Sequence, residues 1–213
     1  MPVTGGHDPG TSHHGLQEKR LALDIAKRVR THLKAAGFAV VMTRETDRFI
    51  PLRSRAALAN RLPADLLVSI HLNANHNRRV AGAEVYYPRE SVISPSASWP
   101  PSIIHQEIGI PLPQVKQVLW DLVLQRKRSQ SRRLAVTICR ALERNLQVNC
   151  KGKSARFAVL REARMPAVLV EVGYVSNLSE ARRLGSAEYR QAAAQSISQG
   201  IVSYVRDVGA QHI

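Results

Sequence analysis

The sequence predicts a single α/β domain in which a mostly parallel, twisted sheet is flanked by helices. Short apolar runs alternate with amphipathic helical segments, an order typical of layered folds with a parallel sheet. The length of 213 residues suits one domain, and a hydrophobic fraction of 44% is sufficient for a core. We therefore expect one domain over residues 1–213, with an insert at about 88–113 that holds six of the eleven prolines.

The part of the chain before the insert predicts two helices and three strands. An amphipathic helix is expected over residues 16–36, because apolar positions recur there every four residues. A second helix is expected at 51–62, which opens on a proline. Three short, apolar-rich runs predict buried strands at 38–43, 66–72 and 83–87.

The part of the chain after the insert predicts a long helix, two strands and two closing helices. The long helix is expected at about 114–147, where apolar residues recur with helical spacing. The apolar runs FAVL and AVLVEVG predict strands at 157–160 and 167–173. Helical patterns then follow at 178–185 and 187–206.

The charge balance favours an anionic partner. The formal net charge is +15, from 31 Lys and Arg against 16 Asp and Glu, which suits nucleic acid, a membrane surface or an acidic cell-wall polymer. The only dense basic block, at residues 126–133, has no interleaved aromatic residue, and we expect no nucleic-acid partner. A nucleic-acid-binding protein using this block remains the alternative, and steep salt dependence of DNA affinity would reveal it.

The sequence shows no targeting signal and no cysteine motif that would indicate a function. No apolar run approaches the roughly 18 residues of a membrane span, so no transmembrane segment is expected, and no signal-peptide pattern is visible. Cys139 and Cys150 show neither a CxxC spacing nor a disulfide framework. Cys139 lies on an apolar helical face, where we expect it to serve in packing.

Three polar side chains are predicted to meet at the edge where the strands end. His71 closes the strand at 66–72, Glu171 lies near the end of the strand at 167–173, and Glu18 begins the first helix. Ligands of such sheets collect beyond the carboxyl ends of the strands. Singly, His71 can be a paired core histidine and Glu18 a charge favoured by the helix dipole. An acid inside the run VLVEVGYV must be paired with another group, be buried at a cost in free energy, or take part in the function of the site.

Taken together, these residues indicate a catalytic zinc site. Histidine and carboxylate ligands with an open position are what catalytic zinc requires. The metal would polarise a carbonyl and activate a water, and Glu171 would act as general base and then protonate the leaving amine. No GxSxG elbow, P-loop or GxGxxG is present, so serine acyl transfer, nucleotide and dinucleotide chemistries lack a signal.

The chain resembles the zinc-dependent N-acetylmuramoyl-L-alanine amidases (type 3) of bacterial cell-wall turnover and division. The resemblance covers nearly the whole chain except the insert and rests on the motifs GGHDPG, GLQEK, TRETDRFIPLRSRAALANR, SIHLNAN and RFAVLREARMPAVLVEVGYVSN. It implies that Glu18 and His71 bind Zn2+ and that Glu171 is catalytic. It also implies hydrolysis of peptidoglycan, at the amide between N-acetylmuramic acid and L-alanine of the stem peptide, by zinc-activated water.

One departure from that family concerns the third zinc ligand. The family normally opens with a strand ending in GHGGxDPG, whose first histidine is a ligand, whereas residues 3–10 here read VTGGHDPG. Thr4 therefore stands at the ligand position, and the preceding strand is missing. We expect His7 to substitute, with His13 and His14 as alternatives, because the glycines make this loop adjustable. Weak zinc binding and little activity are expected of the chain as given.

Further expectations follow from the resemblance. The periplasm or cell envelope is the expected location, and the alternative function is a catalytically silent peptidoglycan-binding module that has lost full zinc coordination. In some division amidases an inserted segment covers the zinc until an activator protein displaces it. Here the insert carries His105 and Glu107, which can fill an open coordination position. An ordinary surface loop is the other interpretation of the insert.

Overall fold

A four-stranded mixed sheet forms the centre of the molecule. The computed structural model describes residues 5–89 and 113–210. The strands lie in the order β3 (Leu67–Asn73), β6 (Ala167–Tyr174), β4 (Ala83–Pro88) and β5 (Cys150–Ala155). β3 is parallel to β6 and β4 is parallel to β5, whereas β4 and β6 are antiparallel. Two of the three pairings are therefore parallel, and the predicted α/β class is confirmed.

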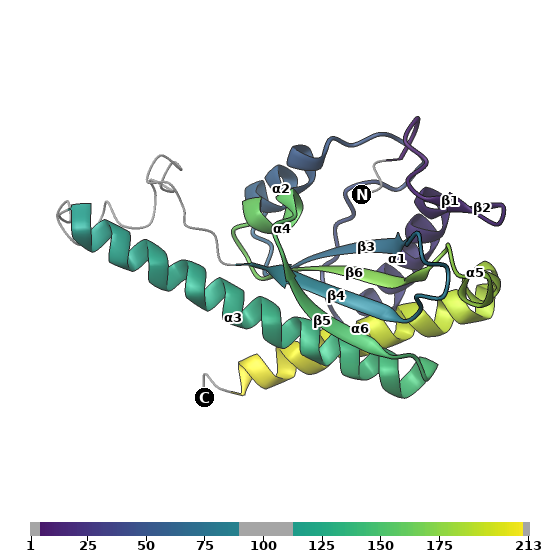
Figure 1. Ribbon diagram of the computed structural model, residues 1–213. Coiled ribbons are helices and arrows are strands. Elements are labelled where there is room, and N and C mark those ends of the chain that lie inside the picture. The colour runs from purple at the N-terminus through teal and green to yellow at the C-terminus, as the bar shows by residue number, and fades with distance from the viewer. Residues whose placement is uncertain (1–4, 90–112, 211–213) are drawn as a thin grey trace.

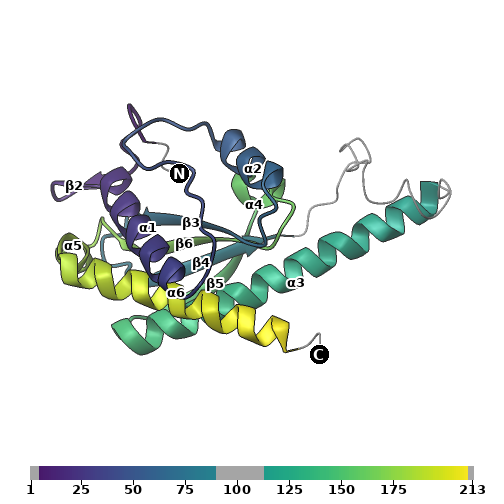
Figure 2. The same ribbon diagram turned by 180° about the vertical axis from the view of Figure 1, so that it is seen from behind.

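Helices cover both faces of this sheet (Figures 1 and 2). The long helices on one face are α1 (Glu18–Ala35), α3 (Pro113–Leu146) and α6 (Ala187–Gly209). The shorter helices are α2 (Leu52–Arg61) and α4 (Ala158–Glu162), which cover the other face, and α5 (Leu178–Gly185), which links β6 to α6. No helix in the described part of the chain is both long and apolar enough to cross a bilayer.

The main core lies between the sheet and the long helices. Ile25, Ile138 and Ile197 supply fully buried side chains from the three helices, and Val170 supplies one from the sheet. α3 and α6 pack closely at Gly200, where a Cβ atom would lie 2.5 Å from the Cα of Ile138. A smaller apolar cluster on the opposite face joins α2, α4 and the start of β6. The face of the sheet that packs on α1, α3 and α6 is therefore covered by the main core, and the opposite face is covered in part by the smaller cluster.

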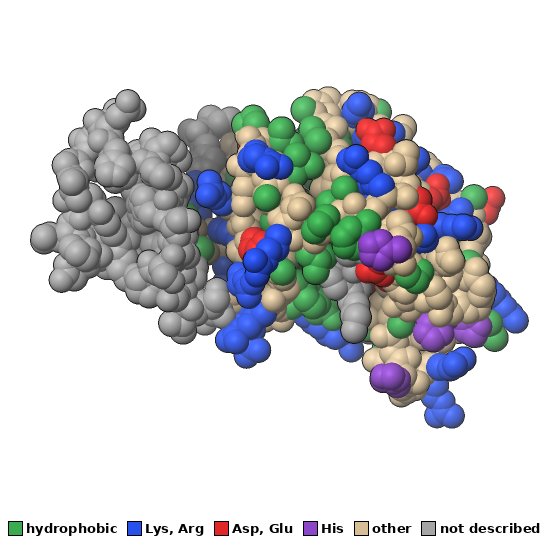
Figure 3. Space-filling view, turned by 90° about the horizontal axis from the view of Figure 1, so that it is seen from above, with side chains coloured by type: hydrophobic (Ala, Val, Ile, Leu, Met, Phe, Trp, Pro, Cys, Tyr) green, Lys and Arg blue, Asp and Glu red, His purple; other side chains and the backbone are tan. Residues whose placement is uncertain are grey.

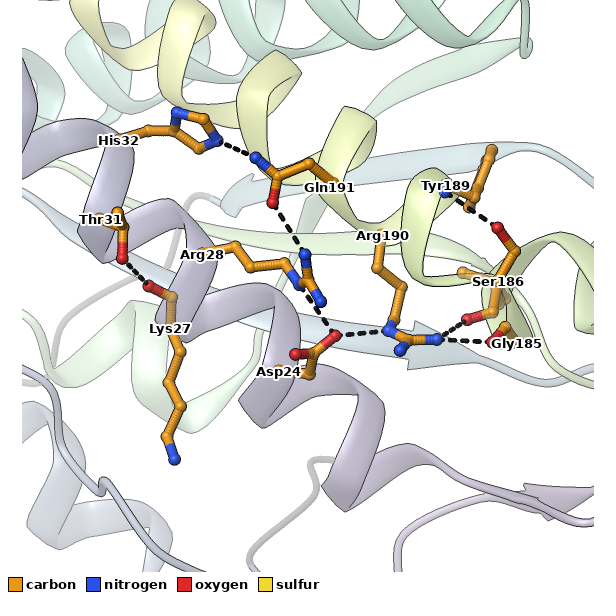
Figure 4. A network of polar contacts seen from close by, with 11 residues as sticks. Asp24, Lys27, Arg28, Thr31, His32, Gly185, Ser186, Tyr189, Arg190 and Gln191 are labelled. Atoms are coloured by element: carbon orange, nitrogen blue, oxygen red, sulfur yellow. Dashed lines mark hydrogen bonds and ion pairs between the residues drawn. The ribbon is translucent and has the colours of Figure 1, made fainter.

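Polar contacts hold α1 against α6 (Figure 4). Asp24 of α1 pairs with Arg28 one turn later and with Arg190 of α6. Arg28 also donates to Gln191 Oε1 at 2.9 Å, and the Gln191 side chain lies 2.8 Å from His32 Nε2. These contacts hold the middle and the C-terminal half of α1 against the start of α6.

Two predicted strands are wrong. Residues 38–43 form no strand in the described structure, because β3 is an edge strand and no ladder reaches this extended segment. Residues 157–160 belong largely to α4, since a short apolar run does not distinguish a strand from a buried helical turn. The sequence reading also missed β5, whose CKGKSA pattern is polar because this edge strand is mostly exposed.

The expected absence of a disulfide is also wrong. Cys139 of α3 and Cys150 of β5 are joined by a disulfide, with their Cα atoms 5.3 Å apart. The bond ties the end of α3 to the start of β5, eleven residues later. The remaining predicted helices and strands are confirmed within a few residues of their ends. Most of the proline-rich insert lies outside the described residues.

Candidate active site

A short hairpin presents Glu18 at the start of α1. Its two strands, β1 (Ser12–His13) and β2 (Leu16–Gln17), are antiparallel, and both turn residues have positive φ. Positive φ angles at both turn positions, which asparagine and glycine adopt most readily, are typical of two-residue hairpins. α1 begins directly after β2, so the hairpin fixes where the Glu18 carboxylate points.

Glu18 and His71 form a buried pair at the end of β3. Glu18 Oε1 lies 3.0 Å from His71 Nδ1, and the side chains are 1% and 2% exposed. The backbone N–H groups of Leu72 and Thr11 donate to the same carboxylate, at 3.3 and 3.0 Å. The other ring nitrogen of His71 lies 2.8 Å from Ser69 Oγ. The structure therefore brings together the two predicted ligands that lie 53 residues apart in the sequence.

Glu171 stands beside this pair in the sheet. It is the register partner of His71 on one side and of Glu84 on the other, so the three side chains leave the same face. Its Oε2 atom is buried and has no hydrogen-bond partner among the described residues. Burial, with smaller contributions from Glu18 and Glu84, raises the pKa of Glu171 to about 8. An orphaned carboxylate oxygen of this kind is suited to holding a water or a substrate group.

A small cavity opens next to Glu171. It has a volume of about 210 Å³ and is lined mainly by apolar residues of α2, β6 and the segment leading into α4. Leu52, Phe157 and Leu169 form its walls, and Arg156 is the one basic residue in the lining. The cavity accommodates a short aliphatic group next to the carboxylate.

The sequence analysis missed Glu84, which is the second acid of this face. It is 6% exposed and pairs with Lys153 and the Tyr86 hydroxyl, while Asn73 Nδ2 lies 3.4 Å from its Oε2. Burial by itself raises the pKa of Glu84, but the hydrogen bonds from Lys153 and Tyr86 outweigh it, and the pKa is lowered. An acid within the apolar run AEVYY was the available signal, by the argument already applied to Glu171.

The structure does not gather the histidines of the N-terminal loop around Glu18 and His71. His7 is exposed and stacks on Phe49, with ring centroids 4.4 Å apart. His13 and His14 lie on the hairpin, with ring centroids 6.3 Å apart. Within residues 5–89 and 113–210, no three metal-binding side chains form a cluster. Thr4, His105 and Glu107 fall outside the described residues, so the third ligand stays a prediction.

An apolar groove lies along the free edge of β3. It encloses about 510 Å³ between α1, the extended segment 38–44, α2 and residues 62–70. Arg55 also lines it, is 8% exposed, and has an Nη2 atom without a hydrogen-bond partner among the described residues. Gly5 lies at one end of the extended segment, where a Cβ would meet Arg48 O at 2.4 Å and Arg44 Nε at 3.3 Å. Arg44 is itself part of the groove lining, so Gly5 lies beside a residue that lines the groove.

Comparison with known proteins identifies related chains. The family model described as N-acetylmuramoyl-L-alanine amidase matches residues 2–203. The chain is 36% identical over 206 residues to the amidase LytC of Bacillus subtilis, covering 96% of this chain and 34% of LytC. It is 32% identical to the amidase AmiA of Escherichia coli, covering 95% of this chain and 74% of AmiA.

A solved structure shows the same fold. The amidase AmiC2 of Nostoc punctiforme superposes with a TM-score of 0.75 at 31% identity, over 96% of this chain and 94% of that one. The chain spans about one third of the length of LytC and most of the AmiC2 chain. The matched region includes the elements that carry Glu18, His71 and Glu171. On these grounds the chain belongs to the N-acetylmuramoyl-L-alanine amidase family.

Proposed function

We propose that this chain is a zinc-dependent peptidoglycan hydrolase that cleaves the amide between N-acetylmuramic acid and L-alanine of the stem peptide. The observation that carries the proposal is the row of His71 and Glu171 in register beside Glu18, with one Glu171 oxygen left without a partner among the described residues. An amide hydrolase needs a base next to an electrophilic centre, and this row supplies both on one sheet face.

The donor set fits zinc in part. Glu18 and His71 offer carboxylate and imidazole donors 3.0 Å apart, and these are common ligands of catalytic zinc. The backbone N–H groups that hold Glu18, and Ser69 beside His71, orient the two ligands. A zinc ion held there would polarise the carbonyl of the scissile amide. Three protein ligands are usual at such sites, so the described residues leave one place for a further donor.

Glu171 is the proposed general base. Its free oxygen takes a proton from the attacking water and then delivers that proton to the departing amine of L-alanine. The apolar cavity beside it offers room for an aliphatic part of the substrate close to the carboxylate. A raised pKa keeps the protonated form available for the second step.

The groove along β3 supports a proposal for the third ligand. A strand laid between β3 and residues 38–43 would pair with the free edge of β3, since neighbouring strands lie about 4.8 Å apart. Arg55 Nη2 in the lining has no hydrogen-bond acceptor among the described residues, and a backbone carbonyl of such a strand would supply one. A strand ending at residue 4 would lead directly into Gly5, and a histidine there would approach the site from the β3 side.

A fusion experiment separates sheet completion from metal ligation. We would add a seven-residue, β-branched strand ending in Gly-His in place of Thr4, with a matched control ending in Gly-Ala. Both fusions should raise the melting temperature, because both fill the groove, but only the histidine version should bind one zinc per chain. Thr4→His alone should restore little. Full zinc occupancy of the unmodified chain, lost in His7→Ala, would instead identify His7 as the ligand and refute the strand as its source.

Activity is tested on purified peptidoglycan. The chain or its Gly-His fusion should release peptides with a new L-alanine amino terminus and create no new sugar reducing ends. Glu171→Gln is the matched control. Peptide release by that variant at the parental rate, or reducing ends as the main product, would refute the proposed reaction.

The catalytically silent binding module remains the second candidate. The observation that favours it is the absence of a three-ligand cluster within residues 5–89 and 113–210. If the chain is such a module, the parent protein and the Glu171→Gln variant should bind sedimented peptidoglycan with equal affinity. Neither protein should release peptide, even with added zinc.

We also propose that the protein acts in the periplasm or cell envelope. The Cys139–Cys150 disulfide supports this location, because disulfides persist mainly in oxidising compartments. An activator protein that displaces the insert is part of the same proposal. Deleting residues 91–110 should raise basal hydrolysis if the insert inhibits, whereas an unchanged rate in a folded variant identifies an ordinary loop.

A further inference from the structure

The outward side of α3 carries arginines that the proposed reaction does not use. Lys127, Ser131 and Ile138 mark the buried side of this helix, and each is at most 8% exposed. Positions that recur every three or four residues along the opposite side form one stripe. We call this stripe the arginine row, and its members are Leu122, Arg126, Ser129, Arg133, Val136, Arg140 and Arg144.

The arginine row is strongly basic along its whole length. Arg126, Arg140 and Arg144 are exposed, and none of the three has an ion pair with another described residue. Glu143 is the one acid between residues 122 and 144, and its carboxylate accepts the backbone N–H of Cys150 at 3.2 Å. From residue 126 to residue 144 an α-helix advances about 27 Å. The row is therefore a track of positive charge several helical turns long.

Apolar side chains are interleaved with these arginines. Leu122 is 55% exposed and Val136 is 37% exposed, and Val123, next to Leu122, is 52% exposed. The N-terminal end of α3, from which the row starts, extends past the neighbouring helices and strands (Figures 1 and 2). Exposed apolar side chains in line with arginines suit a boundary at which apolar and anionic groups meet.

The arginine row and the candidate active site lie on different sides of the molecule. The cavity beside Glu171 lies on the side of the sheet that α2 and α4 cover. Figure 3 looks onto the molecule from that side and shows histidine and acidic side chains among basic and apolar ones. α3 packs on the other side of the sheet, and the row is on the side of α3 that points away from the core. A surface bound by the row therefore leaves this cavity accessible.

We propose that the arginine row docks the protein on an anionic phospholipid surface. The guanidinium groups bind lipid phosphates, and Leu122 and Val136 enter the interfacial layer between them. A soluble polyanion would satisfy the arginines but leave the two apolar side chains in water, so their place within the row favours a bilayer. This inference goes beyond the proposed reaction, because the docking requires neither zinc nor Glu171.

Vesicle sedimentation in the presence of EDTA tests the docking surface. The full chain is mixed with vesicles of equal parts phosphatidylglycerol and phosphatidylcholine, and separately with vesicles of phosphatidylcholine alone. We expect strong binding to the anionic vesicles only. Combining Arg126→Gln, Arg140→Gln and Arg144→Gln should lower the partition coefficient about a hundredfold, because each arginine near such a surface contributes about fivefold.

Leu122→Gln tests the apolar part of the docking surface. It should lower the partition coefficient about fivefold, the effect of withdrawing a half-exposed leucine from the interface. It should leave the affinity for soluble polyphosphate unchanged. The substituted side chains are exposed, so these variants should keep the parental melting temperature.

The matched control combines Arg61→Gln, Arg78→Gln and Arg79→Gln. It removes the same charge from exposed positions outside α3 and should leave vesicle binding nearly unchanged. Equal losses in the control and in the variant of the arginine row would show a general attraction of a chain of net charge +15 to anions and overturn the proposal. Unchanged vesicle binding by Leu122→Gln, with polyphosphate bound as tightly as vesicles, would identify a polymer-binding surface instead. Failure of the parent to bind anionic vesicles would also refute the docking, and it would leave the proposed amidase function standing.

Discussion

Glu171→Gln should make the metal-free protein more stable while it destroys activity. In the unfolded chain a glutamate titrates near pH 4.5, whereas burial raises the pKa of Glu171 in the folded chain to about 8. Between these values the folded state binds more protons than the unfolded state, so this residue makes stability fall as pH rises. Above pH 8 its full cost is about 5 kcal/mol, from 3.5 pKa units at about 1.4 kcal/mol each, and at pH 7 it is about 3 kcal/mol.

Urea unfolding in the presence of EDTA, at whole pH values from 5 to 9, checks this reasoning. The variant should match the parent near pH 5 and exceed it by an amount that grows up to pH 8 and then levels off. Glu45→Gln, whose side chain is 65% exposed, is the control and should change stability little at any pH. Peptide release should fall by about 10² to 10⁴ in Glu171→Gln. A stability gain that does not depend on pH, or a loss, would refute the account of a buried, unpartnered carboxylate.

Three further outcomes follow from the structure. His71→Ala should lower both zinc content and activity, unlike Glu171→Gln, and equal zinc in parent and variant by metal analysis would remove His71 from the site. Cys139→Ser should lower the free energy of unfolding by about 3 kcal/mol, the value expected for a loop of this length, and a reductant should then have no additional effect on the variant. Lys127 is 8% exposed and donates to the carbonyl groups of Leu160 and Ala163, and burial lowers its pKa to about 8. The unfolded chain therefore binds more protons between pH 8 and 10.5, and stability should rise with pH across that window by up to about 3 kcal/mol. Lys127→Met should abolish this rise and exposed Lys27→Met should not; identical slopes in the two variants would contradict it.

The spacing of apolar residues along the sequence predicted the helices and strands in which buried positions recur at regular intervals. The apolar stripe of residues 16–36 became α1, with Ile25 and Val29 buried as the period requires. The run around Glu171 became β6, which is flanked by strands on both sides and needs apolar residues on both faces. Glu18 and His71 were predictable as a pair because strand ends and a helix start meet at one edge of such a sheet.

Pairing between distant segments was decided only by the tertiary structure. Residues 38–43 have strand-like composition, but a strand needs a neighbour, and none of the described strands reaches them. β5 has a polar sequence and is a strand nevertheless, because β4 supplies its ladder. The Cys139–Cys150 bond and the place of Glu84 beside Glu171 depend likewise on α3, β4, β5 and β6 coming together. Sequence alone predicted Glu18, His71 and Glu171 as site residues, and long-range contacts determined their neighbours, because backbone hydrogen bonds and side-chain distances across a sheet are not encoded by local periodicity.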